Sequence, residues 1–224
     1  MNSNVVRILF LKDLYLSRHF LFGYLAGAMA SAILTCLPYK PVSDIGFLLM
    51  ITVTIATGIH MIGLLMLGDG IEHTRAFVLS MPVSVLDYSV SKIAVVLCTF
   101  LIPWSLMLGV AMMGSYLLPY AKPGVVVVLP AIFCFMLSCF TIQLVSAVVT
   151  DSIGWTIVVM VAGNVGLNLF LMNFNSDPAI VAAAKSDTVT WPALAIQVLA
   201  IEWLVIIGSV VLAFYLQTRK RDLV

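Results

Sequence analysis

The sequence predicts an all-α membrane protein with six transmembrane helices, and three observations support this fold class. First, 62% of the 224 residues are hydrophobic and only 9% are charged, whereas a soluble domain has about 25% charged residues. Second, long apolar runs recur, and a helix of about 20 residues crosses the hydrocarbon core of a bilayer. Third, these runs are continuous rather than alternating, which does not fit an outer-membrane barrel.

Six runs are long enough to cross a bilayer, and backbone polar groups in the bilayer core must be paired within a helix. The first run has no convincing cleavage site after it, so it is interpreted as a retained span rather than a signal peptide. The chain is therefore a single membrane domain, residues 1–224, with predicted spans at residues 20–38, 45–67, 94–118, 124–149, 153–172 and 192–216.

The basic residues predict the orientation. If the N-terminus is cytoplasmic, eight of them lie inside (Arg7, Lys12, Arg18, Arg75, Lys92, Arg219, Lys220 and Arg221) and three outside (Lys40, Lys122 and Lys185). The positive-inside rule then places both termini in the cytoplasm.

Residues 1–19 are expected to form a helix at the cytoplasmic membrane interface. On a helical projection Arg7 and Arg18 fall close together, and Val5, Leu9 and Leu16 share another face. The basic stems of such a helix can extend toward water while the apolar side chains face the lipid. The lipid bilayer is therefore the first expected partner.

The external loop, residues 173–191, contains a small apolar patch. The sequence "PAIVAAA" follows Asp177 and is too short to span a bilayer. It is expected to form a short external or re-entrant helix.

Residues 68–92 connect the second and third spans on the cytoplasmic side. Asp69 followed by Glu72 resembles a capping box at a helix start, and Glu72 and Arg75 can pair one turn apart. Pro82 then ends this helix, because proline lacks the donor and restricts the residue before it.

A second helix is expected to begin at Ser84, with Asp87 three residues later, and to continue into the third span. Lys92 would lie near the membrane surface. Two interpretations stay open for this segment: an ordinary interfacial connector, or a docking element that pushes on the third span.

The stretch "EHTRAFVLSMPVSVLDYSVSK" resembles the cytoplasmic loop of the type-2 permease family of ATP-binding-cassette exporters. That loop carries an acidic residue, an aliphatic pair, Ser-Leu-Pro-Val-Ser and then a Lys. The matching elements here are Glu72, Val78-Leu79, Ser80-Met81-Pro82-Val83-Ser84 and Lys92. Val85 stands where the family often has Arg. Lys12-Asp13 resembles the Lys-Asp pair that precedes the first span of small members.

The resemblance implies a transport subunit in a bacterial cytoplasmic membrane that does not hydrolyse ATP itself, and no GxxxxGK[ST] motif is present. ATP and Mg would bind a separate ATPase subunit, and two permease chains would pair as a homodimer or heterodimer. The substrate would be a peptide, an antibiotic or a lipid-like molecule. The implied coupling residues are Glu72, Arg75, Phe77, Ser80, Met81, Pro82 and Ser84, and the implied interface residues of the N-terminal helix are Lys12, Asp13 and Arg18.

Polar side chains inside the predicted spans are candidates for the pathway, because polar groups are costly in a bilayer. Glu202 lies near the middle of the sixth span and is either a substrate or proton contact or a structural acid. His60 has the same two interpretations, with packing favoured. Asn164 and Asn168 share one face of the fifth span and, like Gln143, either bond between helices or line a pore.

Small residues and one proline mark the packing of two spans. Gly23, Gly27 and Ser31 form a small-residue stripe that permits close approach of another helix. Pro103 is expected to kink the third span.

Other chemistries find little support. HExxH and GxSxG are absent, the three histidines are scattered, and the four cysteines contain no CxxC, so no enzymatic or metal site is expected. Nucleic-acid binding lacks a basic patch beyond the C-terminal tail. Two alternatives to the exporter stay open: a stand-alone carrier with Glu202 and His60 in a proton relay, or a non-transporting scaffold or immunity protein.

Overall fold

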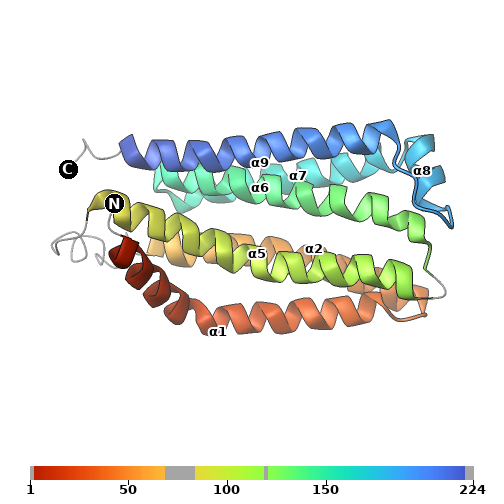
Figure 1. Cartoon of the computed structure of the whole chain (residues 1–224), viewed down its shortest axis with the longest axis horizontal. Coiled ribbons are helices and arrows are strands. Elements are labelled where there is room, and N and C mark those ends of the chain that lie inside the picture. Colours follow the sequence, from red (N-terminus) through yellow and green to blue (C-terminus); the bar gives the residue numbers. More distant parts are fainter. Residues whose placement is uncertain (1–2, 69–83, 119–120, 220–224) are drawn as a thin grey trace.

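A computed structural model describes residues 3–68, 84–118 and 121–219, and in these residues all regular structure is helical (Figure 1). The prediction of an all-α chain is therefore confirmed. The elements are α1 (Ser3–Thr35), α2 (Lys40–Ile62) with a π-helical turn η1 (Gly63–Leu67), α5 (Val85–Leu117), a 3₁₀ turn η2 (Pro123–Val127), α6 (Val128–Thr150), α7 (Ile153–Phe174), the short α8 (Pro178–Ala184) and α9 (Ala193–Arg219).

Five of these helical segments are long and apolar enough to cross a membrane, which supports a membrane-embedded protein. They are Lys40–Leu67, Leu86–Leu117, Pro123–Thr150, Ile153–Phe174 and Ala193–Gln217. The predicted first span, residues 20–38, lies mostly in α1, which is not among the five. The helix ends at Thr35, so only residues 20–35 of that run are helical, fewer than the about 20 that cross a bilayer, and Arg18 and His19 precede them. The prediction of six spans is therefore supported for five.

The long helices run side by side along the long axis of the molecule (Figure 1). One end, here named the loop end, holds the start of α1, the end of η1, the start of α5 and the end of α9. The opposite end, here named the α8 end, holds the α1–α2 turn, η2 and α8. The most enclosed helix is α6, with 72% of its most apolar stretch buried, against 11% for α7.

Side-chain caps mark the starts of two helices, and the sequence predicted the one at Ser84. The hydroxyl of Ser84 accepts a hydrogen bond from the backbone N–H of Asp87 at 3.1 Å, so α5 begins where the cap predicts. Asp177 Oδ1 accepts from the N–H groups of Ala179 and Ile180 at 2.8 and 3.2 Å, which starts α8 within the predicted external loop. From its cap, α5 continues through Pro103 as one helix.

The predicted boundary between an interfacial helix and the first span, at residue 19, falls inside α1. No proline or glycine lies between residues 3 and 22 to break the helix, although Figure 1 shows the first turns of α1 inclined to the rest. Two residues of the expected common face differ in burial: Leu9 is buried, whereas Leu16, about two turns later, is 61% exposed. Because the two side chains project to nearly the same side of the helix, the difference comes from what lies beside each turn of α1.

The turn between α1 and α2 is close-packed through Gly46. A Cβ atom there would lie 2.4 Å from the backbone nitrogen of Thr35 and 2.7 Å from the carbonyl carbon of Leu34. Only glycine lets α2 approach the end of α1 this closely. Pro41 in the first turn of α2 lets that helix begin before the predicted residue 45.

Candidate functional site

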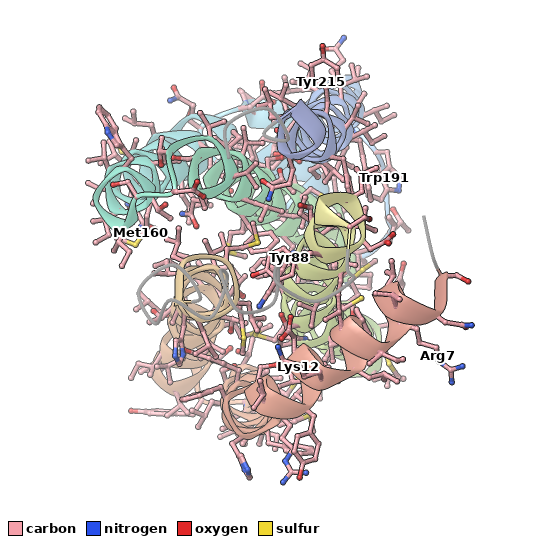
Figure 2. The ribbon with its side chains drawn as sticks, turned by 90° about the vertical axis from the view of Figure 1, so that its left-hand side faces the viewer. Arg7, Lys12, Tyr88, Met160, Trp191 and Tyr215 are labelled. Atoms are coloured by element: carbon pink, nitrogen blue, oxygen red, sulfur yellow. The ribbon has the colours of Figure 1, made fainter. Side chains whose placement is uncertain are left out.

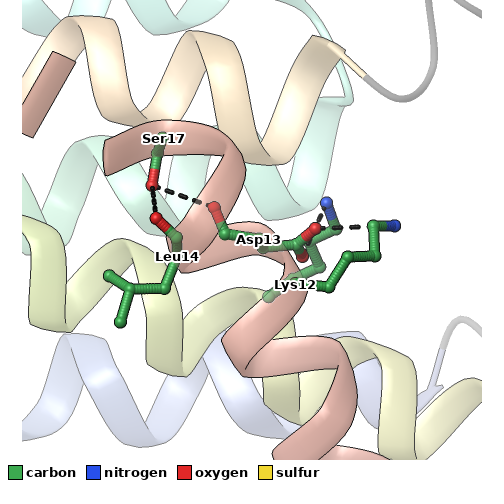
Figure 3. Close-up of polar contacts among 5 residues, drawn as sticks. Lys12, Asp13, Leu14 and Ser17 are labelled. Atoms are coloured by element: carbon green, nitrogen blue, oxygen red, sulfur yellow. Dashed lines mark hydrogen bonds and ion pairs between the residues drawn. The ribbon is translucent and has the colours of Figure 1, made fainter. Parts of the chain in front are cut away.

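A buried ion pair joins α1 to α5 at the loop end. The ammonium of Lys92 lies 3.0 Å from Oδ2 of Asp13, and each side chain is only 5% exposed. Lys12 places a second ammonium 3.6 Å from Oδ1 of the same carboxylate, but from the surface. Figure 3 shows Asp13 with Lys12 and the other polar contacts of this turn. The sequence indicated no link between Asp13 and Lys92, but in the structure they form one site.

Local packing holds the ion pair on both helices. The hydroxyl of Ser17 donates to the backbone carbonyl of Asp13 at 2.9 Å. On α5, Tyr88 is buried against Leu9 of α1, and the Lys92 ammonium lies 5.6 Å from the centre of the Tyr88 ring. The face of α1 that carries Leu9, Asp13 and Ser17 at four-residue spacing therefore faces α5.

The ion pair constrains the two helices more than it stabilises them. Removing two charges from water costs several kcal/mol per ion, and their attraction in the interior roughly offsets this cost. Separating a buried pair leaves an uncompensated charge and costs about 3–5 kcal/mol. The start of α5 therefore cannot move away from α1 without that cost, so the two helix segments are expected to move together.

Six of the seven predicted coupling residues lie outside the described residues: Glu72, Arg75, Phe77, Ser80, Met81 and Pro82. The seventh, Ser84, caps α5. Lys92 follows this cap by about two helical turns. The ion pair thus lies on the helix that leaves the predicted coupling segment.

Arg18, the third predicted interface residue of the N-terminal helix, does not take part in the ion pair. Its guanidinium lies 3.8 Å from the centroid of the Tyr15 ring, and its Nε lies 3.5 Å from Nε2 of His19. These contacts belong to the outer side of α1.

Glu202 is buried between α9 and α6, with an exposed fraction of 6%. Within the described part of the chain, neither of its carboxylate oxygens has a hydrogen-bond partner. The hydroxyl of Ser138 donates to the backbone carbonyl of Glu202 at 3.4 Å, not to its side chain. A carboxyl without a partner in an apolar interior is costly as an anion, so Glu202 is a candidate proton-binding group.

His60 belongs to α2, and its ring contacts α1. Its Nδ1 is 2.8 Å from the hydroxyl of Tyr24, and its ring meets Phe20 edge-on with centroids 4.6 Å apart. These partners fit a packing role. No hydrogen bond connects His60 with Glu202, whose carboxylate has none among the described residues.

Gln143 and Asn164 line one small cavity of about 20 Å³ between α2, α5, α6 and α7, together with Thr54. This volume suits about one water molecule. Asn168 is exposed, and its amide donates to the backbone carbonyl of Asn164 at 2.9 Å. This hydrogen bond lies within α7.

The small-residue stripe of α1 serves the α1–α2 contact only in part. A Cβ on Gly27 would lie 3.5 Å from Val53 of α2, whereas a Cβ on Gly23 would meet nothing within 4 Å. Ser31 is buried and donates to the backbone carbonyl of Ala28 at 2.9 Å. Gly23 therefore takes no part in the α1–α2 contact, whereas Gly27 does.

A larger cavity at the α8 end had no signal in the sequence. It is open to the outside and has a volume of about 720 Å³ between the α1–α2 turn, the end of α5, η2 and the start of α6. Its lining is mainly apolar, and several of its polar residues come from helix ends and turns: Lys40, Ser43, Asp44, Ser115, Lys122 and Asn175. Polar residues are also common where helices end at a membrane surface. The sequence alone therefore does not show that these residues line a cavity.

Two further findings bear on the identity of the chain. In the part of the chain that the structure describes, no three His, Cys, Asp or Glu side chains gather closely enough to hold a metal ion. No protein-family model matches the chain, and comparisons with characterised proteins and with solved structures give no match.

Proposed function

We propose that the chain is the permease subunit of an ATP-driven exporter of the type-2 ATP-binding-cassette class. In this proposal it lies in a bacterial cytoplasmic membrane with both termini in the cytoplasm, pairs with a second permease chain and docks on a separate ATPase. The ion pair between Asp13 and Lys92 carries the proposal. It joins α1 to α5, the helix that follows the predicted coupling residues. A separate ATPase that moves α5 would act on the chain at this point.

The length of α5 supports this mechanism. Its 33 residues correspond to about 50 Å at 1.5 Å per residue. The helix begins within the predicted coupling segment, residues 68–92, and its far end contributes Ala111, Gly114 and Ser115 to the α8-end cavity. Motion imposed at the loop end would therefore reach the cavity through a single helix.

The cavity supports a substrate of amphipathic character. Its volume of about 720 Å³ falls in the usual range of small-molecule sites, about 300–1,000 Å³. Phe47 and Leu129 belong to its apolar lining, while Lys40 and Asp44 add charges. A short peptide, an antibiotic or a lipid-like molecule has the matching combination of apolar body and polar group.

The direct test is isolation of the tagged chain from native membranes in a mild detergent. The proposal expects a protein with a phosphate-binding GxxxxGK[ST] loop to accompany it in near-equal amount, together with ATP hydrolysis in the eluate. A chain that never brings an ATPase with it, in cells whose transport survives ATP depletion, would refute the proposal.

A stand-alone proton-coupled carrier is the second candidate, and the unpartnered carboxyl of Glu202 favours it. Such a carrier would lose transport on addition of an uncoupler and in Glu202→Gln, with ATP still present. An ATP-driven exporter would keep transport under both conditions.

A further inference from the structure

The outer side of the first turns of α1 carries an ordered mixture of basic and apolar side chains. Ile8 is 66% exposed, Leu11 48% and Tyr15 61%. Figure 2 looks onto the loop end and shows these turns crossing it, with Arg7 pointing away from the other helices. We name this surface the outward face, and it comprises Arg7, Ile8, Leu11, Lys12, Tyr15, Arg18 and His19.

The order of these residues around the helix is specific. At 3.6 residues per turn, Leu11, Tyr15 and Ile8 form a central apolar stripe. Arg7 and Arg18 border the stripe on one side, and Lys12 and His19 border it on the other. Apolar side chains flanked by basic ones are typical of a helix that lies at the boundary between lipid headgroups and acyl chains.

The charge of the outward face is not balanced within α1. Asp13 is the only acidic residue of this helix, and it points to the opposite side, where the ammonium of Lys92 lies 3.0 Å away in the interior. Lys12 lies 3.6 Å from the same carboxylate. One carboxylate therefore faces two ammonium groups, and one positive charge is left over. Arg18 stacks on Tyr15 at 3.8 Å, which holds its cation beside the apolar stripe.

The position of the outward face along the chain identifies its surroundings. The helix continues without a break from residue 3 into the apolar run that begins at Phe20. Where this run enters the bilayer, as the sequence predicts, the outward face meets the bilayer at its surface. Anionic headgroups are attracted to basic residues at that depth, and each such residue contributes measurably to the attraction.

We propose that the outward face of α1 is a binding site for anionic phospholipid headgroups. Ile8, Leu11 and Tyr15 insert between the upper parts of the acyl chains, while Arg7, Lys12 and Arg18 contact the phosphates. This site does not depend on the proposed exporter function, because it requires only that the chain lies in a membrane.

The test uses the full chain in phosphatidylcholine nanodiscs that contain a small fraction of a photoreactive lipid. The reactive group lies next to the headgroup, which is phosphatidylglycerol in one preparation and phosphatidylcholine in the other. After illumination, mass spectrometry counts adducts on residues 3–22 relative to adducts on the exposed face of α9. The expected result is a clear excess of phosphatidylglycerol adducts at low salt, which falls at high salt because the charges are screened.

The variant Arg7→Gln/Arg18→Gln removes two charges and leaves the Asp13–Lys92 pair intact. It should lower the phosphatidylglycerol adducts about five-fold per charge removed and leave the phosphatidylcholine adducts unchanged. The matched control, Lys40→Gln/Lys185→Gln, removes the same charge at the α8 end and should have no effect on residues 3–22. Equal labelling of the native chain by both lipids, or no labelling of residues 3–22 by either, would overturn the proposal, the latter because a protein partner would then cover this face.

Discussion

The clearest quantitative prediction concerns Lys92→Met, which keeps the apolar stem of the side chain and removes its charge. Breaking a buried ion pair costs about 3–5 kcal/mol. Lys12 remains 3.6 Å from the carboxylate of Asp13, and a surface ion pair contributes at most about 1 kcal/mol. The expected loss in the free energy of unfolding is therefore about 2–4 kcal/mol.

Thermal unfolding of the purified chain in detergent measures this loss. For a chain of this size, 1 kcal/mol lowers Tm by about 2–4 °C, so Lys92→Met should lower Tm by about 4–16 °C. The control is Lys122→Met, since Lys122 pairs with Asp187 on the surface, where the two side chains are 52% and 80% exposed. That variant should lose at most about 1 kcal/mol.

The double variant Asp13→Leu/Lys92→Met separates a lost ion pair from general damage. Replacing both partners of a buried pair with apolar groups is often neutral or stabilising, so the double variant should recover most of the loss. A Tm within 2 °C of the native value for Lys92→Met would refute the reasoning. So would a double variant whose loss equals the sum of the two single losses.

Three further predictions test other elements. Gly46→Ala should lower stability by about 1–3 kcal/mol, because its Cβ would lie 2.4 Å from a backbone nitrogen of α1; Gly23→Ala, which meets nothing within 4 Å, should leave Tm unchanged or raised. If residues 68–92 dock on an ATPase, Glu72→Ala and Pro82→Ala should leave the chain in the membrane and the ATPase bound. ATP hydrolysis should then continue without transport. Normal coupling of hydrolysis to transport in both variants would count against docking. Glu202→Gln should leave ATP-driven transport near its native rate, whereas its loss would favour the proton-coupled carrier.

The helices themselves follow from the sequence because the bilayer leaves an apolar chain few alternatives. Long apolar runs must satisfy their backbone groups internally, and caps such as Ser84 and Asp177 specify where a helix begins through a local hydrogen bond. Both signals involve neighbouring residues. They can therefore be recognised in the sequence, and α5 begins at the cap that Ser84 predicted.

The Asp13–Lys92 pair could not be predicted in the same way. The sequence analysis noted the two residues for separate reasons, and their contact depends on how α1 lies against α5. The exposure of Leu16 could not be predicted either. Leu9 and Leu16 project to nearly the same side of α1, yet only Leu9 is buried, because α5 covers that side at the turn of Leu9, where Tyr88 packs against it. A helical projection shows which residues share a side but not which turns a neighbouring helix covers.

Helix α5 connects the buried ion pair at the loop end with the large cavity at the α8 end. At the loop end, Lys92 fixes the helix to α1; at the α8 end, Ser115 lines the large cavity. Between them Pro103 cannot donate a backbone hydrogen bond, so it is the residue at which α5 bends most easily. A displacement of the loop end must therefore either travel along the helix to the cavity or be absorbed at Pro103. Because a buried ion pair resists separation, the anchored segment moves as a unit and the far segment is the part free to respond.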